Sequence, residues 1–97
     1  MAQVVYSRRA LSDLHRLELF LARQAPDVAE VAMLTIFDAI EVLERHPLIG
    51  RRSQGPYREL VIAYGQRGYV ALYRFEPRRQ IVRVLAIRHQ REAGFQE

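Results

Sequence analysis

The 97-residue sequence contains no cysteine and no stretch of eighteen or more apolar residues. The first absence excludes disulfide bonds, thiolate chemistry and cysteine-ligated metal. The second excludes a membrane-spanning helix. The first thirteen residues have no basic segment followed by an apolar one, so they are not typical of a secretory signal. We therefore expect a reducing, cytoplasmic environment.

Lysine is also absent, and all fifteen basic residues are arginine. The planar guanidinium group suits phosphate and carboxylate, but genome-wide codon bias explains the lack of lysine equally well, and we favour that explanation. The distribution of charge is more informative. Residues 1–48 hold five arginines and seven acidic residues, a net charge of −2, whereas residues 49–97 hold ten arginines and four acidic residues, a net charge of +6. A basic C-terminal half could meet RNA, DNA or an acidic protein segment.

The composition that remains is that of a folded domain. Apolar residues make up 49% of the chain, which is typical of globular proteins. The length is sufficient for one hydrophobic core. We therefore expect residues 1–97 to form a single domain.

Signals for a short strand and a helix open the chain. β-branched and aromatic residues at about 3–6 indicate the strand, and Ser7 suits the N-cap of a helix. Leucines then recur at helical spacing. This helix should end near Gln24, because Pro26 disfavours helical geometry in the preceding residue.

A second helical pattern follows directly. Asp27 and Glu30 have the spacing of a capping box, and Pro47 should end the helix. Two helices joined by about three residues pack antiparallel. The N-terminal half therefore predicts a helical hairpin.

Three strand patterns fill the C-terminal half, at residues 57–63, 69–75 and 80–88. Their connections are short enough for hairpins, which predicts an antiparallel meander. The expected fold is α+β, in the order β-α-α-β-β-β, with the helical hairpin packed on a small, mainly antiparallel sheet.

Strict alternation assigns the last strand to two faces. It places Val82, Val84 and Ala86 on one face, which ends at Arg88. His89 belongs to the other face.

No metal or cofactor site is expected. The three histidines, His15, His46 and His89, are scattered without paired spacing, so a zinc centre has little support. No glycine-rich phosphate loop or nucleophile elbow occurs either.

Arginines near the strand ends form the candidate site. Arg58, Arg74, Arg88 and Arg91, with His89, could converge on the sheet if the strands pair in simple register. Metal-free RNA cleavage needs a base, an acid and cations for the phosphorane charge, and His89 could transfer the proton. The alternative is that Arg74 and Arg88 solvate a sheet face and pair with glutamates across strands. Small basic domains more often bind than catalyse, so we favour a binding surface.

Four segments, RHPLIGR, YRELVI, YVALYRF and VLAIRHQREAGF, occur in an order that resembles the RelE/ParE superfamily of toxins from bacterial type II toxin–antitoxin systems. The resemblance covers nearly all of the chain. It implies growth arrest by one of two routes. RelE-like members are ribosome-dependent endoribonucleases that cut mRNA, whereas ParE-like members poison DNA gyrase.

The resemblance favours the ParE branch, because typical nuclease positions are altered. Arg58 matches one basic position, but Leu60 stands where a second lysine is common. Val70 replaces the arginine that is typical after Gly-Tyr of the middle strand, and Phe95 lies where some nucleases use tyrosine. A phosphorane would lack part of its cation set. We therefore expect a gyrase-binding protein without catalytic residues, whose target surface is formed by Arg58, Arg74, Arg88, His89 and Arg91.

An RNA-cleaving alternative stays open, with His89, Arg91 and Arg58 as the catalytic set of a RelE-like mRNA interferase. A protein that has lost toxicity is a third possibility. Direct contact with nucleic acid is also left open.

The resemblance implies a ParD-like antitoxin, whose disordered C-terminal segment folds on the toxin. Its acidic residues would meet the arginine-rich half. Leu19, Phe20 and Met33 fall partly outside the narrowest core stripes and are candidate antitoxin contacts, although ordinary burial is the expectation that we prefer for all three.

Overall fold

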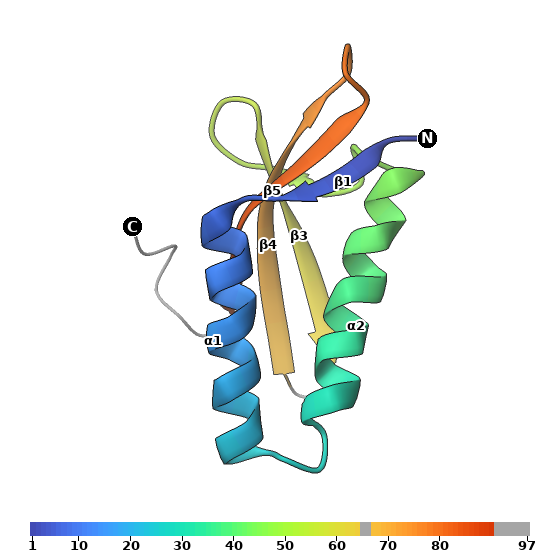
Figure 1. The fold of residues 1–97 in the computed structure, drawn as a ribbon. Helices are drawn as coiled ribbons and strands as arrows, with labels where there is room; N and C mark the ends of the chain where they lie inside the picture. Colours follow the sequence, from blue (N-terminus) through green and yellow to red (C-terminus); the bar gives the residue numbers. More distant parts are fainter. Residues whose placement is uncertain (65–66, 91–97) are drawn as a thin grey trace.

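The computed structural model describes residues 1–64 and 67–90. Within them, two α-helices pack on one face of a five-stranded sheet (Figure 1). The elements in chain order are β1 (Gln3–Tyr6), α1 (Arg8–Gln24), α2 (Ala29–Glu41), the 3-10 helix η1 (Val42–Glu44), β2 (Arg51–Arg52), β3 (Tyr57–Tyr64), β4 (Arg67–Glu76) and β5 (Ile81–His89). The predicted α+β class and the helical hairpin are confirmed.

The strand order in the sheet is β1-β5-β4-β3-β2. The predicted antiparallel meander of β3, β4 and β5 is confirmed, and β1 is added parallel to β5. The two-residue strand β2 pairs antiparallel with β3. It was not predicted, because it lies in a segment without any hydrophobic period.

The two helices begin differently. Ser7 caps α1 as predicted, since its Oγ accepts a hydrogen bond of 3.0 Å from the backbone N–H of Ala10. The predicted cap at Asp27 is wrong, because α2 follows Val28 without a side-chain cap. The N–H of Val28 donates to the carbonyl of Ala25, so a turn delays the helix past Asp27.

The core lies between the helices and the sheet. The helices contribute apolar residues at helical spacing to it. Its members from α1 and α2 are Ala10, Leu14, Leu17, Leu21, Ala32, Met33, Ile36 and Ile40, and those from the meander are Ile62, Tyr69, Ala71, Tyr73, Val82, Val84 and Ile87. Full burial of a large apolar side chain stabilises the fold by about 1.5–3 kcal/mol. No helix in the described part of the chain is long and apolar enough to cross a bilayer.

A β-bulge interrupts the ladder between β4 and β5. Leu72 lies opposite Ala86, but Tyr73 lies opposite Val84, so Leu85 is an extra residue on β5. An extra residue inverts the alternation of side chains beyond it. The predicted assignment of faces therefore holds as far as Val84 and is wrong after it.

The inversion moves the two polar residues that end β5. His89 pairs with Tyr69 and Ile87 with Ala71, on the side that faces the helices. Arg88 pairs with Val70 on the opposite side, which no helix covers (Figure 1). We call this side, opposite the helices, the open face of the sheet.

Side chains of α1 and of its N-cap cover part of the outer edge of β5. β1 is shorter than β5, and no other strand of the described residues pairs with that edge over its second half. The Ser7 hydroxyl donates to the Leu85 carbonyl (3.0 Å), Asp13 Oδ2 accepts from the Ile87 N–H (2.8 Å) and Arg16 Nη2 donates to the Ile87 carbonyl (3.4 Å). An exposed strand edge is a template for unwanted pairing, and these bonds occupy it.

Candidate functional site

The structure divides the predicted target-binding residues between the two sides of the sheet. Arg74 and Arg88 lie on the open face, whereas Arg58 and His89 lie on the side that faces the helices. Arg91 lies outside the described residues. The four described residues therefore do not form one cluster.

Arg58 and His89 are also separated along the strands. Arg58 lies opposite Tyr73 and His89 lies opposite Tyr69, an offset of four residues on β4. At 3.3–3.4 Å per residue this offset is roughly 13 Å. Two catalytic groups must lie within hydrogen-bond reach of the same substrate atoms, so this pair is poorly placed for shared catalysis.

Arg58 fixes a loop rather than extending into solvent. Its Nη1 donates to the carbonyls of Leu48 (3.2 Å) and Gly50 (2.9 Å). Beside it, the Tyr73 hydroxyl accepts from the Gly50 N–H (2.9 Å) and donates to the Pro47 carbonyl (2.8 Å). Burial raises the pKa of this hydroxyl above its ordinary value, so it stays protonated and able to donate. We call Arg58 and Tyr73 the loop anchor.

His89 and Arg88 close the end of β5. The His89 ring stands edge-to-face on the Tyr69 ring, with centroids 5.4 Å apart and an interplanar angle of 82°. Arg88 Nη1 lies 3.3 Å from the carbonyls of both His89 and Gln90, to which it donates. These contacts order the end of the strand on both of its faces.

A second group of arginines surrounds one carboxylate at the β4–β5 hairpin. The Nε of Arg83 donates to Glu76 Oε2 at 2.9 Å, and Arg74 and Arg79 each place a nitrogen 3.9 Å from the same carboxylate. The hydrogen bond from Arg83, supported by the nearby positive charges, lowers the pKa of Glu76 below its ordinary value. Arg78 completes the set.

We call Arg74, Arg78, Arg79 and Arg83 the hairpin arginines. They line a shallow hollow of about 540 Å³ together with Phe75, Glu76 and Pro77. Sequence reasoning missed this group apart from Arg74. The signal that could have found it is the density of arginine around the predicted turn, because cross-strand pairing sets Arg74 directly opposite Arg83.

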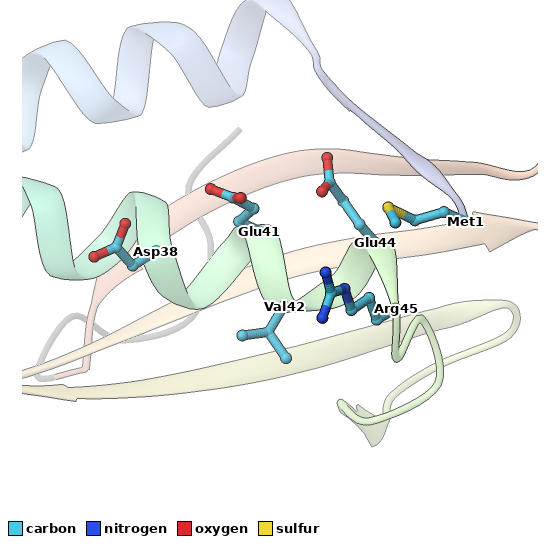
Figure 2. Close-up of a pocket in the computed structure, with 6 residues that line it drawn as sticks. All are labelled: Met1, Asp38, Glu41, Val42, Glu44 and Arg45. Atoms are coloured by element: carbon cyan, nitrogen blue, oxygen red, sulfur yellow. The ribbon is translucent and has the colours of Figure 1, made fainter.

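A hollow of opposite charge lies on α2 and η1, with a volume of about 410 Å³. Figure 2 shows its lining, in which carboxylates follow one another along the helix beside the N-terminal Met1: Met1, Asp38, Glu41, Val42, Glu44 and Arg45. Among residues 1–64 and 67–90, no three potential metal-ligating side chains lie together in a way that could hold an ion. We therefore describe this hollow as an acidic surface and not as a metal site.

The predicted antitoxin contacts differ in exposure. Leu19 and Phe20 on α1 are 48% and 49% exposed, so the burial that we preferred for them is wrong. Met33 is only 8% exposed and packs in the core, so it offers almost no surface to a partner. Further large apolar residues on the two helices are exposed, namely Leu11, Val31, Leu34 and Phe37.

The solved structures that share this fold include chains from bacterial toxin–antitoxin complexes. A chain of the chromosomal ParDE system of P. aeruginosa superposes with a TM-score of 0.76 at 22% identity, over 92% of this chain and 96% of that one. A chain of the intact E. coli RelBE complex gives a TM-score of 0.64 at 14% identity, over 96% and 100%. The architecture is therefore that of the RelE/ParE toxins.

Sequence comparison specifies the family. The profile described as "ParE toxin of type II toxin-antitoxin system, parDE" matches residues 4–94. Two toxins of Caulobacter vibrioides are also similar: Toxin RelE3 is 37% identical over 95% of this chain and 98% of its own length, and Toxin RelE2 is 34% identical over 92% and 96%. The chain belongs to the ParE toxin family, within the RelE/ParE superfamily of type II toxin–antitoxin systems.

Proposed function

We propose that this toxin inhibits DNA gyrase, trapping its cleaved DNA complex, and that a ParD-like antitoxin neutralises it. The observation that carries the proposal is the separation of Arg58 from His89, because the nuclease alternative needs these two residues close together. In this proposal the protein binds its target and catalyses no reaction itself.

The chemistry of RNA cleavage supports this choice. Removing one charge-stabilising donor from such a site costs several kcal/mol of transition-state stabilisation, on the order of 3. Here Arg58 is committed to the carbonyls of Leu48 and Gly50, and Val70 is fully buried at the position after Gly-Tyr. Neither residue supplies a cation to a phosphate bound near His89.

The proposed gyrase-binding residues are Arg88 and His89 at the end of β5, Arg91 beyond the described residues, and Arg74, which shares the open face with Arg88 but lies toward the hairpin end of β5. Arg58 contributes indirectly, because it fixes the adjacent loop. Arginine and aromatic side chains contribute much of the binding energy in protein interfaces, and this surface offers several arginines.

The proposed antitoxin site lies on the helices. Leu19 and Phe20 from α1, with Val31 and Leu34 from α2, present apolar side chains that the fold leaves exposed. An apolar surface of this kind is typical of a partner site for a segment that folds on binding. The solved relatives are toxin–antitoxin complexes, which supports such a partner here.

The second candidate is a ribosome-dependent mRNA interferase. The Caulobacter vibrioides relatives carry the name RelE, and His89 is present at the end of β5. Arg91 would have to supply the missing cation beside His89.

Two parallel assays with antitoxin-free toxin discriminate between the candidates. One measures gyrase supercoiling and the accumulation of cleaved DNA, and the other measures mRNA cleavage on programmed ribosomes. Inhibited supercoiling with intact mRNA is the expected result. Cut mRNA with unaffected gyrase would overturn the proposal, and absence of growth arrest on expression without antitoxin would indicate an inactive toxin.

The surface is tested by His89→Ala combined with Arg91→Ala. We expect growth arrest to be abolished while the melting temperature stays within a few degrees of the wild-type value. The matched control is Arg8→Ala on α1, which removes an exposed arginine that is not part of this surface. Full toxicity of the double variant would show that the surface is wrongly assigned.

A further inference from the structure

We propose that the hairpin arginines bind the phosphate backbone of duplex DNA directly. This goes beyond the proposed function, in which the toxin acts on gyrase, and it does not depend on it. A site at this position lies at the opposite end of β5 from His89.

The hairpin presents these arginines on a projecting ribbon. Figure 1 shows that the turn between β4 and β5 extends past the ends of both helices. Gln80 closes the turn, since its side-chain Nε2 donates to the Pro77 carbonyl at 2.8 Å and its φ of 53° reverses the chain. Arg78 and Arg79 are thus held at the tip of the turn, between Pro77 and Gln80.

Positive charge exceeds the available acceptors at this site. Among the described residues that line the hollow, Glu76 is the single acidic one, against four arginines, so these residues carry a net charge of about +3 at neutral pH. Its short hydrogen bond goes to Arg83, whereas the Nε of Arg74 is buried and donates no hydrogen bond within the described part of the chain.

The outermost arginines are open to solvent. The Arg79 side chain is 72% exposed, and Arg78 is exposed and has no ion pair with any described residue. Guanidinium groups with free donors bind phosphate oxygens in a bidentate manner. Both residues are therefore available to an external anion.

The absence of apolar anchors favours a nucleic acid over an acidic peptide. From Gly68 to Gln90, no large apolar side chain is exposed in the described structure; those that are exposed lie on the helices and at Met1, Leu48, Ile49 and Val61. A peptide that folds on binding needs apolar anchors, whereas the affinity for a phosphate backbone comes from cations alone.

The shape favours duplex DNA over RNA. The major groove of B-form DNA admits a two-stranded ribbon, while the deep, narrow major groove of A-form RNA does not. A ribbon tipped by Arg78 and Arg79 can enter the DNA groove, with Arg74 and Arg83 behind them facing phosphates.

Fluorescence anisotropy with the antitoxin-free toxin and a short labelled DNA duplex tests the assignment. The variant Arg78→Gln with Arg79→Gln should weaken binding about tenfold and should reduce the slope of log affinity against log salt by about 2, since each lost phosphate contact contributes about 0.9. The matched control is Arg8→Gln with Arg23→Gln on α1, which removes the same charge from exposed positions and should change affinity less than about twofold.

Each other outcome overturns the proposal. If the wild-type chain does not bind the duplex, the proposal is wrong. Equal weakening of binding by both double variants would attribute the affinity to overall charge rather than to the hairpin. Tighter, hairpin-dependent binding of single-stranded RNA or poly-glutamate would reassign the site to another partner. If the double variant melts at a lower temperature, Arg79→Glu alone is measured, and unchanged affinity in that variant also overturns the assignment.

Discussion

The two sides of the sheet use polar side chains in different ways. On the side that faces the helices, Arg58 and Tyr73 from the sheet and Asp13 from α1 are each hydrogen-bonded to backbone groups. On the open face at the hairpin, several arginines share one carboxylate, Glu76. The comparison teaches that the role of an arginine follows from the acceptors around it. Substitutions on the first side should cost stability, and those at the hairpin should change charge-dependent behaviour.

The largest effect is expected for Gly50→Ala, at the loop anchor. A β-carbon there would lie 2.6 Å from the ring and hydroxyl of Tyr73 and 2.9 Å from the Glu59 carbonyl. Overpacking of this kind costs about 3 kcal/mol of unfolding free energy. Urea denaturation measures the loss.

Gly55→Ala is the matched control for this substitution. Gly55 has open space around it and a φ of +56°, so alanine should cost only about 1 kcal/mol, from backbone strain. Equal losses at the two glycines would show that close approach to Tyr73 is unimportant.

The next effect is expected for Arg58→Ala. The substitution leaves the carbonyls of Leu48 and Gly50 without their charged donor, which should cost about 2 kcal/mol. Arg78→Ala at the hairpin should stay within about 0.5 kcal/mol of the wild type, because Arg78 makes no ion pair or side-chain hydrogen bond with the described residues. Similar losses of unfolding free energy in the two variants would show that arginines bonded to the backbone and arginines at the hairpin do not differ in their contribution to stability.

The sequence predicted the order of the main elements because their signals are local. Leucine spacing, Ser7 and the prolines identified the helices, and β-branched runs identified the strands. The capping pattern at Asp27 failed because a turn that ends at Val28 competes with it.

The candidate site was less predictable because it depends on pairing between strands. Alternation carried past Val84 placed Arg88 and His89 on the wrong faces, since Leu85 adds a residue that leaves no mark in the hydrophobic pattern. The edge bonds of Asp13 join α1 to the far end of the chain and have no local signal either.

A smaller effect is expected for Asp13→Ala on the helix-facing side. Losing this acceptor leaves the Ile87 N–H on a stretch of the β5 edge that no described strand pairs with, which should cost about 1.5 kcal/mol. Asp13→Asn keeps an oxygen in place and should cost less than half of that. Amide hydrogen exchange at Ile87 reports the bond directly, and unchanged exchange in the alanine variant would contradict the role.

The smallest effect is expected at Glu76 and appears only in acid. Because its folded-state pKa lies below the ordinary value of 4.5, folding favours the charged carboxylate. Its contribution to stability is therefore fully present above about pH 4.5 and is lost as the pH falls through the lower folded-state pKa. The stability of Glu76→Gln should consequently decline less over this acidic range than that of the wild type. An NMR titration of the Glu76 carboxyl, compared with Arg83→Gln, tests the cause, since removing the Arg83 hydrogen bond should return the pKa toward 4.5. An unshifted carboxyl in the wild type would show that Glu76 does not hold the arginines together, and the hairpin would then carry four independent cations.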